Sequence, residues 1–420
     1  MEQRSSSRLY YGWIVVAVTA LVLIVSAGVR SAPGVFLVPM LPDFGDNRTA
    51  ISFAASLGIF LFGLAGPLSG WLMDRRGPRV TMMLGMGLVG ASMLLSARMQ
   101  SLWELNLFWG LLSGLGTGMA SAVLGAAVAS RWFVQRRGLV TGVFGASTSA
   151  GQLIFVLLLA ALAESMGWRT STLLLGGVAL AILLPTLLLM RDDPADIGLR
   201  PYGAPADGAA TRAAAETGVM GRALRSWTFW LLCATFFVCG ATSNGLIGVH
   251  FIPHAVDHGI GQMAAAGTLS IMGMFNFVGT IGSGWLTDRY DPRRLLAVYY
   301  GFRGLSLLLL PFTTHEYGLL VFAVLFGLDY IATVPPTTAL VADTFGRRNV
   351  GTVFGWVFCA HQAGAALAAW LGGVARAALG SYAPAFIAAG VIAVAAAGLS
   401  LMIARGRAGA APAATAAAAQ

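Results

Sequence analysis

The sequence predicts an all-α membrane protein with twelve transmembrane helices, arranged as two six-helix bundles related by pseudosymmetry. Three observations lead to this fold class: the composition, the number of long apolar segments, and a repeat shared by the two halves of the chain. Hydrophobic residues make up 57% of the 420 residues, and charged residues only 10%. A typical soluble domain has about a quarter of its residues charged. Most of the surface is therefore expected to face lipid.

Twelve apolar segments are long enough to cross a bilayer, since about 20 helical residues span a hydrocarbon core of about 30 Å. They begin near Tyr11, Ala50, Val80, Leu102, Gly138, Trp168, Ser226, Gln262, Leu295, Tyr317, Val350 and Tyr382. Short turns with polar residues, Gly or Pro separate them. The first segment is too long for a cleaved signal peptide and lacks a small-residue cleavage site.

One long polar break divides the twelve segments six and six. It runs from Arg191 to Arg225 and is rich in Asp, Ala and Gly. We therefore expect a bundle over residues 1–190, a cytoplasmic linker over 191–225 and a second bundle over 226–407. The Ala-rich tail, 408–420, is of low complexity and is expected to be disordered.

The arginines predict the orientation in the membrane. All 26 basic residues are arginine, and most lie at the termini, in the central linker and in the even-numbered loops. Basic residues mark cytoplasmic loops, so both termini are expected in the cytoplasm of a multi-pass protein of a bacterial inner membrane. The net charge of +9 then reflects topology and not a nucleic-acid partner. Two arginines, Arg30 and Arg303, remain inside the predicted spans.

The two halves share a repeat in three separate places. The segment SGWLMDRRGPR at Ser69–Arg79 recurs as SGWLTDRYDPR at Ser283–Arg293. The same spacing places Asn244 opposite Arg30, and a nearly identical spacing places Gln362 opposite Gln152. Repeated halves with a site between them are typical of transporters.

The repeated loop carries a resemblance to a known family. Its pattern, Gly70-x-x-x-Asp74-Arg75-x-Gly77-x-Arg79, resembles the signature loop of the major facilitator superfamily, and the resemblance extends over essentially the whole chain. In the second copy Asp291 replaces the second glycine. The resemblance implies a cytoplasmic gate in which the aspartate caps a neighbouring helix and pairs with arginines. The expected gate residues are Asp74, Arg75, Arg79, Asp288 and Arg289.

Two further segments look like the monocarboxylate transporter branch, which includes oxalate–formate exchangers. They are Tyr11-Gly12-Trp13 and the run Trp132-Phe133-x-x-Arg136-Arg137-x-Leu139. This resemblance implies that a cation in the first span binds the substrate carboxylate, and Arg30 lies close to that place. It also implies proton coupling through an Asp and an Arg one helical turn apart in the eighth span. This chain has Asn276 and Thr280 there instead.

Arg30 is a candidate anion site on physical grounds as well. A charge near the bilayer centre costs a few kcal/mol, so an arginine at that depth suggests a function. Its guanidinium can hold a carboxylate through two parallel hydrogen bonds. The alternative is an arginine that snorkels to the outer headgroups. We favour the anion site because the span continues past Arg30, and Asn244 is then a neutral partner for another polar group of the substrate.

Asp329 and Arg303 reach similar depths in adjacent predicted spans. We expect a structural ion pair between them, with Asp329 as a proton carrier as the alternative. His361 lies near mid-membrane next to Gln362 and can change charge near neutral pH, so it is a candidate for substrate contact or proton coupling. The predicted substrate-binding residues are Arg30, Gln152, Asn244, Asn276, His361 and Gln362.

The sequence offers little support for ATP-driven, cofactor-dependent or metal-dependent chemistry. The absence of lysine removes the phosphate-binding lysine of ATPases, and no cofactor is expected. His250, His254 and His258 recur at a spacing that can bind metal, but we expect a hydrated helix end or an outer-gate surface and no metal site.

We therefore expect a secondary active transporter and not an enzyme. By alternating access it would move a small organic anion, a monocarboxylate, as a monomer coupled to protons. The alternative is a drug or metabolite exporter of the same superfamily, although exporters of lipophilic cations are expected to carry an acid where Arg30 stands.

Overall fold

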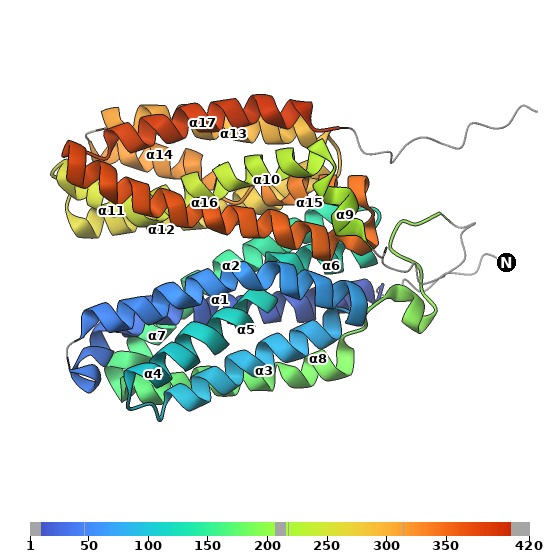
Figure 1. The fold of residues 1–420 in the computed structure, drawn as a ribbon, viewed down its shortest axis with the longest axis horizontal. Coiled ribbons are helices and arrows are strands. Elements are labelled where there is room, and N and C mark those ends of the chain that lie inside the picture. Colours follow the sequence, from blue (N-terminus) through green and yellow to red (C-terminus); the bar gives the residue numbers. More distant parts are fainter. Residues whose placement is uncertain (1–9, 46, 206–215, 217, 314, 405–420) are drawn as a thin grey trace, which may run out of the picture.

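The structure, a computed structural model, consists of helices that run side by side in two bundles (Figure 1). It describes residues 10–404 except 46, 206–215, 217 and 314. The tail 408–420, expected to be disordered, lies outside the described residues. Eleven helical stretches among the described residues are of transmembrane length, and large apolar side chains such as Leu157, Leu184 and Trp370 are exposed. The all-helical membrane fold predicted from the composition is confirmed.

The first bundle, in the lower half of Figure 1, contains the elements from α1 to α8. They are α1 Gly12–Met40, η1 Leu41–Phe44, α2 Arg48–Arg76, α3 Pro78–Ser96, α4 Leu102–Leu105, η2 Asn106–Leu112, α5 Ser113–Met119, α6 Ala122–Trp132, α7 Arg137–Ala181 and α8 Leu183–Leu189. Several of their ends follow from sequence, as where Pro78 begins α3 in the position that proline favours.

The second bundle contains the elements from α10 to α17 (Figure 1). They are α10 Trp227–Gly240, η4 Ala241–Ile247, α11 Gly248–Asp257, α12 Gln262–Thr287, α13 Pro292–Leu309, η5 Leu310–Phe312, α14 Glu316–Asp329, α15 Val334–Phe345, η6 Arg347–Asn349, α16 Val350–Leu379 and α17 Ala383–Met402. The linker between the bundles forms η3 Pro194–Ile197 and α9 Val219–Leu224.

Eleven continuous stretches are long and apolar enough to span a membrane, and one of them crosses it twice. This stretch, Arg137–Leu189, has 53 residues. At about 1.5 Å per residue it is more than twice as long as a hydrocarbon core of about 30 Å. The chain turns inside it at Gly167, whose φ of 80° and ψ of 158° are not helical. Twelve crossings result, beginning within a few residues of the predicted starts.

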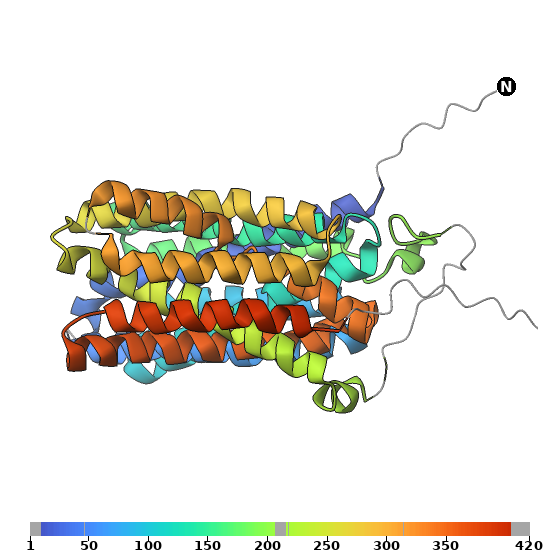
Figure 2. The same cartoon turned by 90° about the horizontal axis from the view of Figure 1, so that it is seen from above.

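The linker lies at one end of both bundles, which we call the linker end (Figure 2). There it contacts both bundles: Asp193 pairs with Arg348 at 2.9 Å, and Tyr10 Oη donates to the Arg200 carbonyl at 2.8 Å. The other end, at which Gly167 turns the chain, is called the far end.

The bundles touch each other most extensively through two helix pairs, α2 with α16 and α7 with α12, and also where α6 meets α16 and α7 meets α15. Glycines allow the backbones to approach closely: a Cβ on Gly70 would lie 1.9 Å from the Gly351 carbonyl oxygen, and one on Gly138 would lie 2.4 Å from that of Gly284. Both contacts lie on the linker side of the molecule. Small residues of this kind permit close helix packing in lipid.

Two aspartates fasten the same helix pairs in an equivalent way. Asp74, at the end of α2, accepts a hydrogen bond from Thr352 N at 2.7 Å in the first turn of α16. Asp288 accepts bonds from Gly138 N at 2.6 Å and Leu139 N at 2.9 Å in the first turn of α7. Each carboxylate meets unpaired N–H groups at the positive end of a helix. The two bundles are thus sealed together at the linker end.

The glycine contact gives a testable prediction. Gly70→Ala should force α2 and α16 apart, because its Cβ would overlap the Gly351 carbonyl. Backbone amides in the first turns of α16 should then exchange hydrogen for deuterium faster, as measured by mass spectrometry. Gly87→Ala in α3 is the control, since a Cβ there meets nothing within 4 Å. Equal exchange in the two variants would show that this contact does not close the linker end.

Candidate functional site

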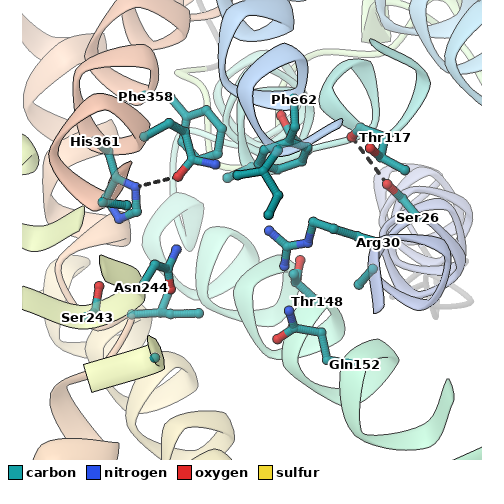
Figure 3. A pocket seen from close by; sticks show the side chains of 18 of the residues that line it. Ser26, Arg30, Phe62, Thr117, Thr148, Gln152, Ser243, Asn244, Phe358 and His361 are labelled. Atoms are coloured by element: carbon teal, nitrogen blue, oxygen red, sulfur yellow. Dashed lines mark hydrogen bonds between the residues drawn. The ribbon is translucent and has the colours of Figure 1, made fainter. Parts of the chain in front are cut away.

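A cavity of about 460 Å³ lies between the two bundles (Figure 3). Its walls come mainly from α1, α2, α5, α6 and α7 of the first bundle and from α10, η4, the turn after α14 and α16 of the second. This volume lies within the range of small-molecule sites in proteins, about 300–1,000 Å³. Five of the six residues predicted to bind substrate line it: Arg30, Gln152, Asn244, His361 and Gln362.

Among the residues that the structure describes, Arg30 is the one charged residue in the cavity wall. Its guanidinium carbon lies 4.9 Å from the centre of the Phe62 ring, a cation–π contact. It forms no ion pair with any described carboxylate. A guanidinium that is desolvated and lacks a counterion is stabilised by an anion, and it can bind a carboxylate through two parallel hydrogen bonds.

Two polar side chains of α7 lie beside Arg30. Thr148 and Gln152 are one helical turn apart and so lie on the same face of the helix. Figure 3 shows both next to the Arg30 guanidinium. They offer hydrogen-bonding groups close to the positive charge.

The opposite wall is polar but uncharged. Asn244 lies in η4, and its Oδ1 accepts a hydrogen bond from Tyr330 Oη at 3.3 Å. His361 Nδ1 and Gln362 Oε1 lie 3.0 Å apart. The His361 ring stacks on Phe358 with the ring centres 5.8 Å apart and the planes at 4°. This wall can donate and accept hydrogen bonds but brings no permanent charge.

Part of this wall is not regular α-helix. η4 is a π-helical segment, and the chain between α14 and α15, residues 330–333, is a turn. Backbone that departs from the α-helix inside a bilayer needs other partners for its polar groups. Arg303 provides them: its Nη2 donates to the Asp329 carbonyl at 2.6 Å and to the Tyr330 carbonyl at 3.1 Å.

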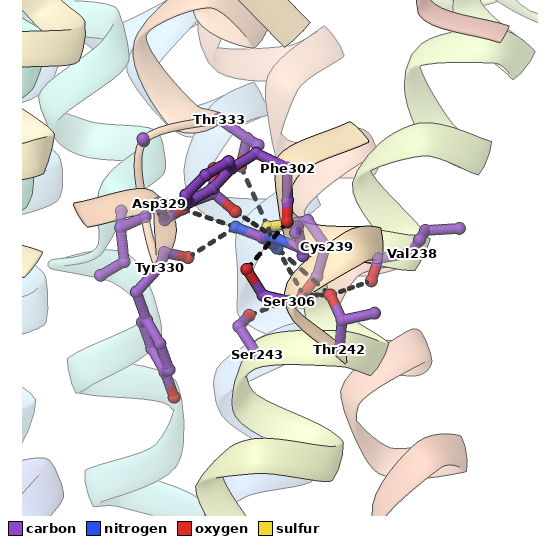
Figure 4. A network of polar contacts seen from close by, with 12 residues as sticks. Val238, Cys239, Thr242, Ser243, Phe302, Ser306, Asp329, Tyr330 and Thr333 are labelled. Carbon is purple, nitrogen blue, oxygen red and sulfur yellow. Dashed lines mark hydrogen bonds and ion pairs between the residues drawn. The ribbon is translucent and has the colours of Figure 1, made fainter. Parts of the chain in front are cut away.

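Figure 4 shows this turn, at Asp329 and Tyr330, beside the neighbouring broken helix, at Cys239 and Thr242. The same arginine joins the two. Arg303 Nε pairs with Asp329 Oδ2 at 2.6 Å, and Nη1 bonds Cys239 Sγ at 3.1 Å and Thr242 Oγ1 at 3.2 Å. The Arg303 side chain is fully buried, and neither member of the ion pair lines the cavity. The geometry favours a structural role, because the pair fixes the two segments that carry Asn244 and Tyr330.

Asn276 is not among the residues that line the cavity, although the sequence placed it in the site. Its Nδ2 donates to Ser149 Oγ at 2.8 Å, and its Oδ1 accepts from Thr280 Oγ1 at 3.0 Å and from Ile331 N at 3.2 Å. Both ends of the amide are thus occupied. The side chain ties α12 to α7 and to the turn after α14.

The arginines of the repeated loops do not pair across the bundles as expected. Arg75 and Arg289 lie over the tryptophans of their own helices, Trp71 at 4.7 Å and Trp285 at 3.9 Å. Arg79 donates to the Leu187 carbonyl within its own bundle. Arg131 pairs with Asp74 within the first bundle at 3.4 Å, and a different arginine pairs across the bundles, where Arg137 of the first lies 2.9 Å from Asp343 of the second.

The expectation of a hydrated helix end at the three histidines was wrong for two of them. His250 and His254 are buried, and His254 is only 1% exposed. His250 Nε2 lies 2.8 Å from the Ala369 carbonyl, and the His254 ring packs 4.9 Å from that of Phe386. The helix α11 turns this face toward α16 and α17, so packing outweighs hydration.

Sequence reasoning missed several residues of the cavity. Phe62, Thr148, Tyr330 and Phe358 line it. Helical spacing could have found two of them, since Thr148 lies four residues before Gln152 and Phe358 four before Gln362. Tyr330 depends on the break in its helix, which only the downstream Pro335 and Pro336 suggest.

Comparison with known proteins gives the family. The family model of the Major Facilitator Superfamily matches residues 19–328 and 281–419. The chain belongs to this superfamily. As a member it is a multi-pass membrane transporter and not an enzyme, and the signature loop identified in the sequence is the one that seals the linker end.

Relatives of this transporter extend over nearly its whole length. It is 28% identical to an uncharacterized MFS-type transporter, YcxA, of Bacillus subtilis, over 88% of this chain and 89% of the relative. It is 27% identical to monocarboxylate transporter 12-B of Danio rerio, over 94% and 87% of the two chains. It is 29% identical to monocarboxylate transporter 13 of Rattus norvegicus, over 90% and 86%.

Solved structures share its fold. The proton:xylose symporter XylE superposes with a TM-score of 0.74 at 15% identity, covering 93% of this chain and 95% of that one. The transporter FucP in the outward conformation superposes with a TM-score of 0.70 at 16% identity, covering 94% and 100%.

The buried ion pair gives the second prediction. Asp329→Asn should lower the free energy of unfolding by about 3–5 kcal/mol, because it leaves Arg303 charged and unpaired in a dry site. The double variant Arg303→Gln/Asp329→Asn should recover most of this loss, since two neutral amides can still bond each other and the backbone carbonyls of the turn. Thermal unfolding in detergent measures both. A double variant less stable than Asp329→Asn would contradict the structural pair.

Proposed function

We propose that this chain is a secondary active transporter of a small organic anion, a monocarboxylate, which it moves by alternating access with proton coupling. The observation that carries the proposal is Arg30, a cation in the wall of the central cavity with no acidic partner among the described residues. Relatives named monocarboxylate transporters, at 27–29% identity over most of both chains, support the same substrate class.

Charge argues against the alternative, an exporter of lipophilic cations. A cationic drug would meet Arg30 in a cavity to which the described residues contribute no carboxylate. Like charges at short range in a desolvated site repel strongly. A monoanion instead removes the cost of the buried guanidinium, and a single positive charge matches a single carboxylate.

In the proposed mechanism the units 1–190 and 226–407 rock against each other about the cavity, joined by the linker 191–225. The arginine asymmetry places the linker end and both termini in the cytoplasm, in a bacterial inner membrane, with the protein acting as a monomer. The sealed linker end then corresponds to the state that is closed toward the cytoplasm. Ile59 and Val249 line the cavity and are also exposed, which is consistent with a cavity that is open to the surface.

We assign proton coupling to His361 rather than to Asp329. His361 lines the cavity, where a proton and a substrate can reach it, whereas Asp329 is sealed behind the wall against Arg303. Imidazole exchanges protons near neutral pH. A protonated His361 would add a second positive charge near the bound anion, so proton binding and anion binding would favour each other.

The third prediction tests the anion site. Arg30→Ala should abolish carboxylate binding, and Arg30→Lys should weaken it, because lysine keeps the charge but loses the planar fork. A carboxylate at about 100 times its dissociation constant should stabilise the wild type by about 2.7 kcal/mol and leave Arg30→Ala unchanged. Thermal shift with purified protein measures this.

Arg98→Ala is the matched control, since Arg98 is an exposed arginine outside the cavity. It should retain the full ligand-induced shift. Transport of a carboxylate by Arg30→Ala with unchanged apparent affinity would overturn the anion site.

The fourth prediction tests proton coupling. Wild-type protein in vesicles should take up the carboxylate faster under an inward proton gradient than without one. His361→Gln should lose this stimulation yet still exchange labelled for unlabelled substrate, because exchange needs no net proton movement. His258→Gln, which alters a histidine outside the cavity, is the control. Equal stimulation in His361→Gln and wild type would exclude His361 as the coupling group.

A further inference from the structure

The cavity has two chemically different poles, one in each bundle. The charged pole consists of Arg30, Thr148 and Gln152 in the first bundle, and the neutral pole consists of Asn244, Tyr330, His361 and Gln362 in the second. Figure 3 shows Arg30, Thr148 and Gln152 on one side and Asn244 and His361 on the other. A ligand that fills the cavity therefore meets a cation at one end and uncharged hydrogen-bonding groups at the other.

A row of aromatic rings connects the two poles. The Arg30 guanidinium lies 4.9 Å from the centre of Phe62, whose ring centre is 5.7 Å from that of Phe358 in an edge-to-face contact. Phe358 in turn stacks on His361. Phe236 lies 4.7 Å from His361 and also lines the cavity. Such rings pack well against another flat ring, in offset-stacked or edge-to-face geometry.

The size of the cavity points to a ligand larger than a three-carbon acid. Small-molecule sites enclose most of the surface of their ligands. An anion as small as lactate, held at Arg30, would leave most of the roughly 460 Å³ to water and would not reach the neutral pole. A substituted benzene ring with its carboxylate at Arg30 extends along the row of rings.

The neutral pole limits the second substituent. Asn244 and Gln362 carry amides, and Tyr330 carries a hydroxyl that already bonds Asn244. These groups can bond a hydroxyl, carbonyl or amide. While His361 is unprotonated, a second carboxylate would lie there without a cation and would lose its hydration without compensation.

We propose that the substrate is an aromatic monocarboxylate with an uncharged hydrogen-bonding group at the end of the ring opposite the carboxylate. This inference rests on the proposed function, because it takes Arg30 as the carboxylate anchor. Benzoate, 4-hydroxybenzoate, terephthalate and lactate are the probes that separate its parts. Binding to the purified protein is measured by thermal shift and by titration calorimetry.

The wild type should bind 4-hydroxybenzoate up to about tenfold more tightly than benzoate, the gain expected of one or two net hydrogen bonds. Benzoate should in turn bind more tightly than lactate, and terephthalate should bind at least about tenfold more weakly than 4-hydroxybenzoate. Asn244→Ala should weaken 4-hydroxybenzoate more than benzoate, and so remove the preference for the hydroxyl. Phe358→Leu should weaken both aromatic acids and spare lactate.

The outcomes distinguish the inference from the function on which it rests. If lactate binds through Arg30 but the aromatic acids bind no better, the aromatic substrate is wrong and the monocarboxylate transporter stands. If terephthalate binds as tightly as 4-hydroxybenzoate, the neutral pole is wrong. If no carboxylate binds to the wild type, both proposals fail. Asn244 is exposed to the cavity, so its variant is expected to fold, which its melting temperature without ligand verifies.

Discussion

In a bilayer, each backbone N–H and C=O must find its partner within the protein, and this constraint shapes the whole molecule. It explains why regular helices make up the lipid-facing walls, since a helix satisfies its own backbone. It also explains where helices are interrupted. The break at Ala120 and Ser121, the π-helical η4 and the turn at Tyr330 all border the central cavity. Irregular backbone is tolerated there because neighbouring side chains, and water in the cavity, can satisfy it.

The two arginines inside the membrane meet this constraint in opposite ways. Arg303 donates its hydrogen bonds to protein groups: a carboxylate, two backbone carbonyls and the polar side chains of Cys239 and Thr242. Nothing remains for a ligand, and its variants should act through stability. Arg30 contacts only an aromatic face among the interactions described for it. Its donors stay available to a ligand, so the same residue type is structural in one place and a candidate anchor in the other.

The sequence predicts features that depend on residue spacing, but not those that depend on how separate helices pack. Apolar length alone located the twelve crossings, and the repeat placed Asn244 opposite Arg30 across the chain, because both are properties of residues at fixed spacing. The break at Tyr330 and the bonding of Asn276 depend on how separate helices pack, so periodicity could not reveal them. The family resemblance placed Asn276 in the site, yet its amide is already hydrogen-bonded to Ser149, Thr280 and the Ile331 backbone. Depth in the membrane identifies candidates, but only the partners decide among them.

The symmetry of the fold is kept at the linker end and lost in the cavity. Asp74 of the first bundle caps α16 of the second, and Asp288 of the second bundle caps α7 of the first. Opening this end therefore breaks the same kind of contact on both sides. In the cavity, the repeat sets a cation against a neutral amide. A ligand that bonds both poles holds the bundles together, and it binds best in the conformation in which the poles are closest. A ligand shifts a conformational equilibrium only by its difference in affinity for the two states. Because the poles lie in different bundles, an anion that spans them has such a difference, whereas one held by Arg30 alone would bind without drawing the bundles together.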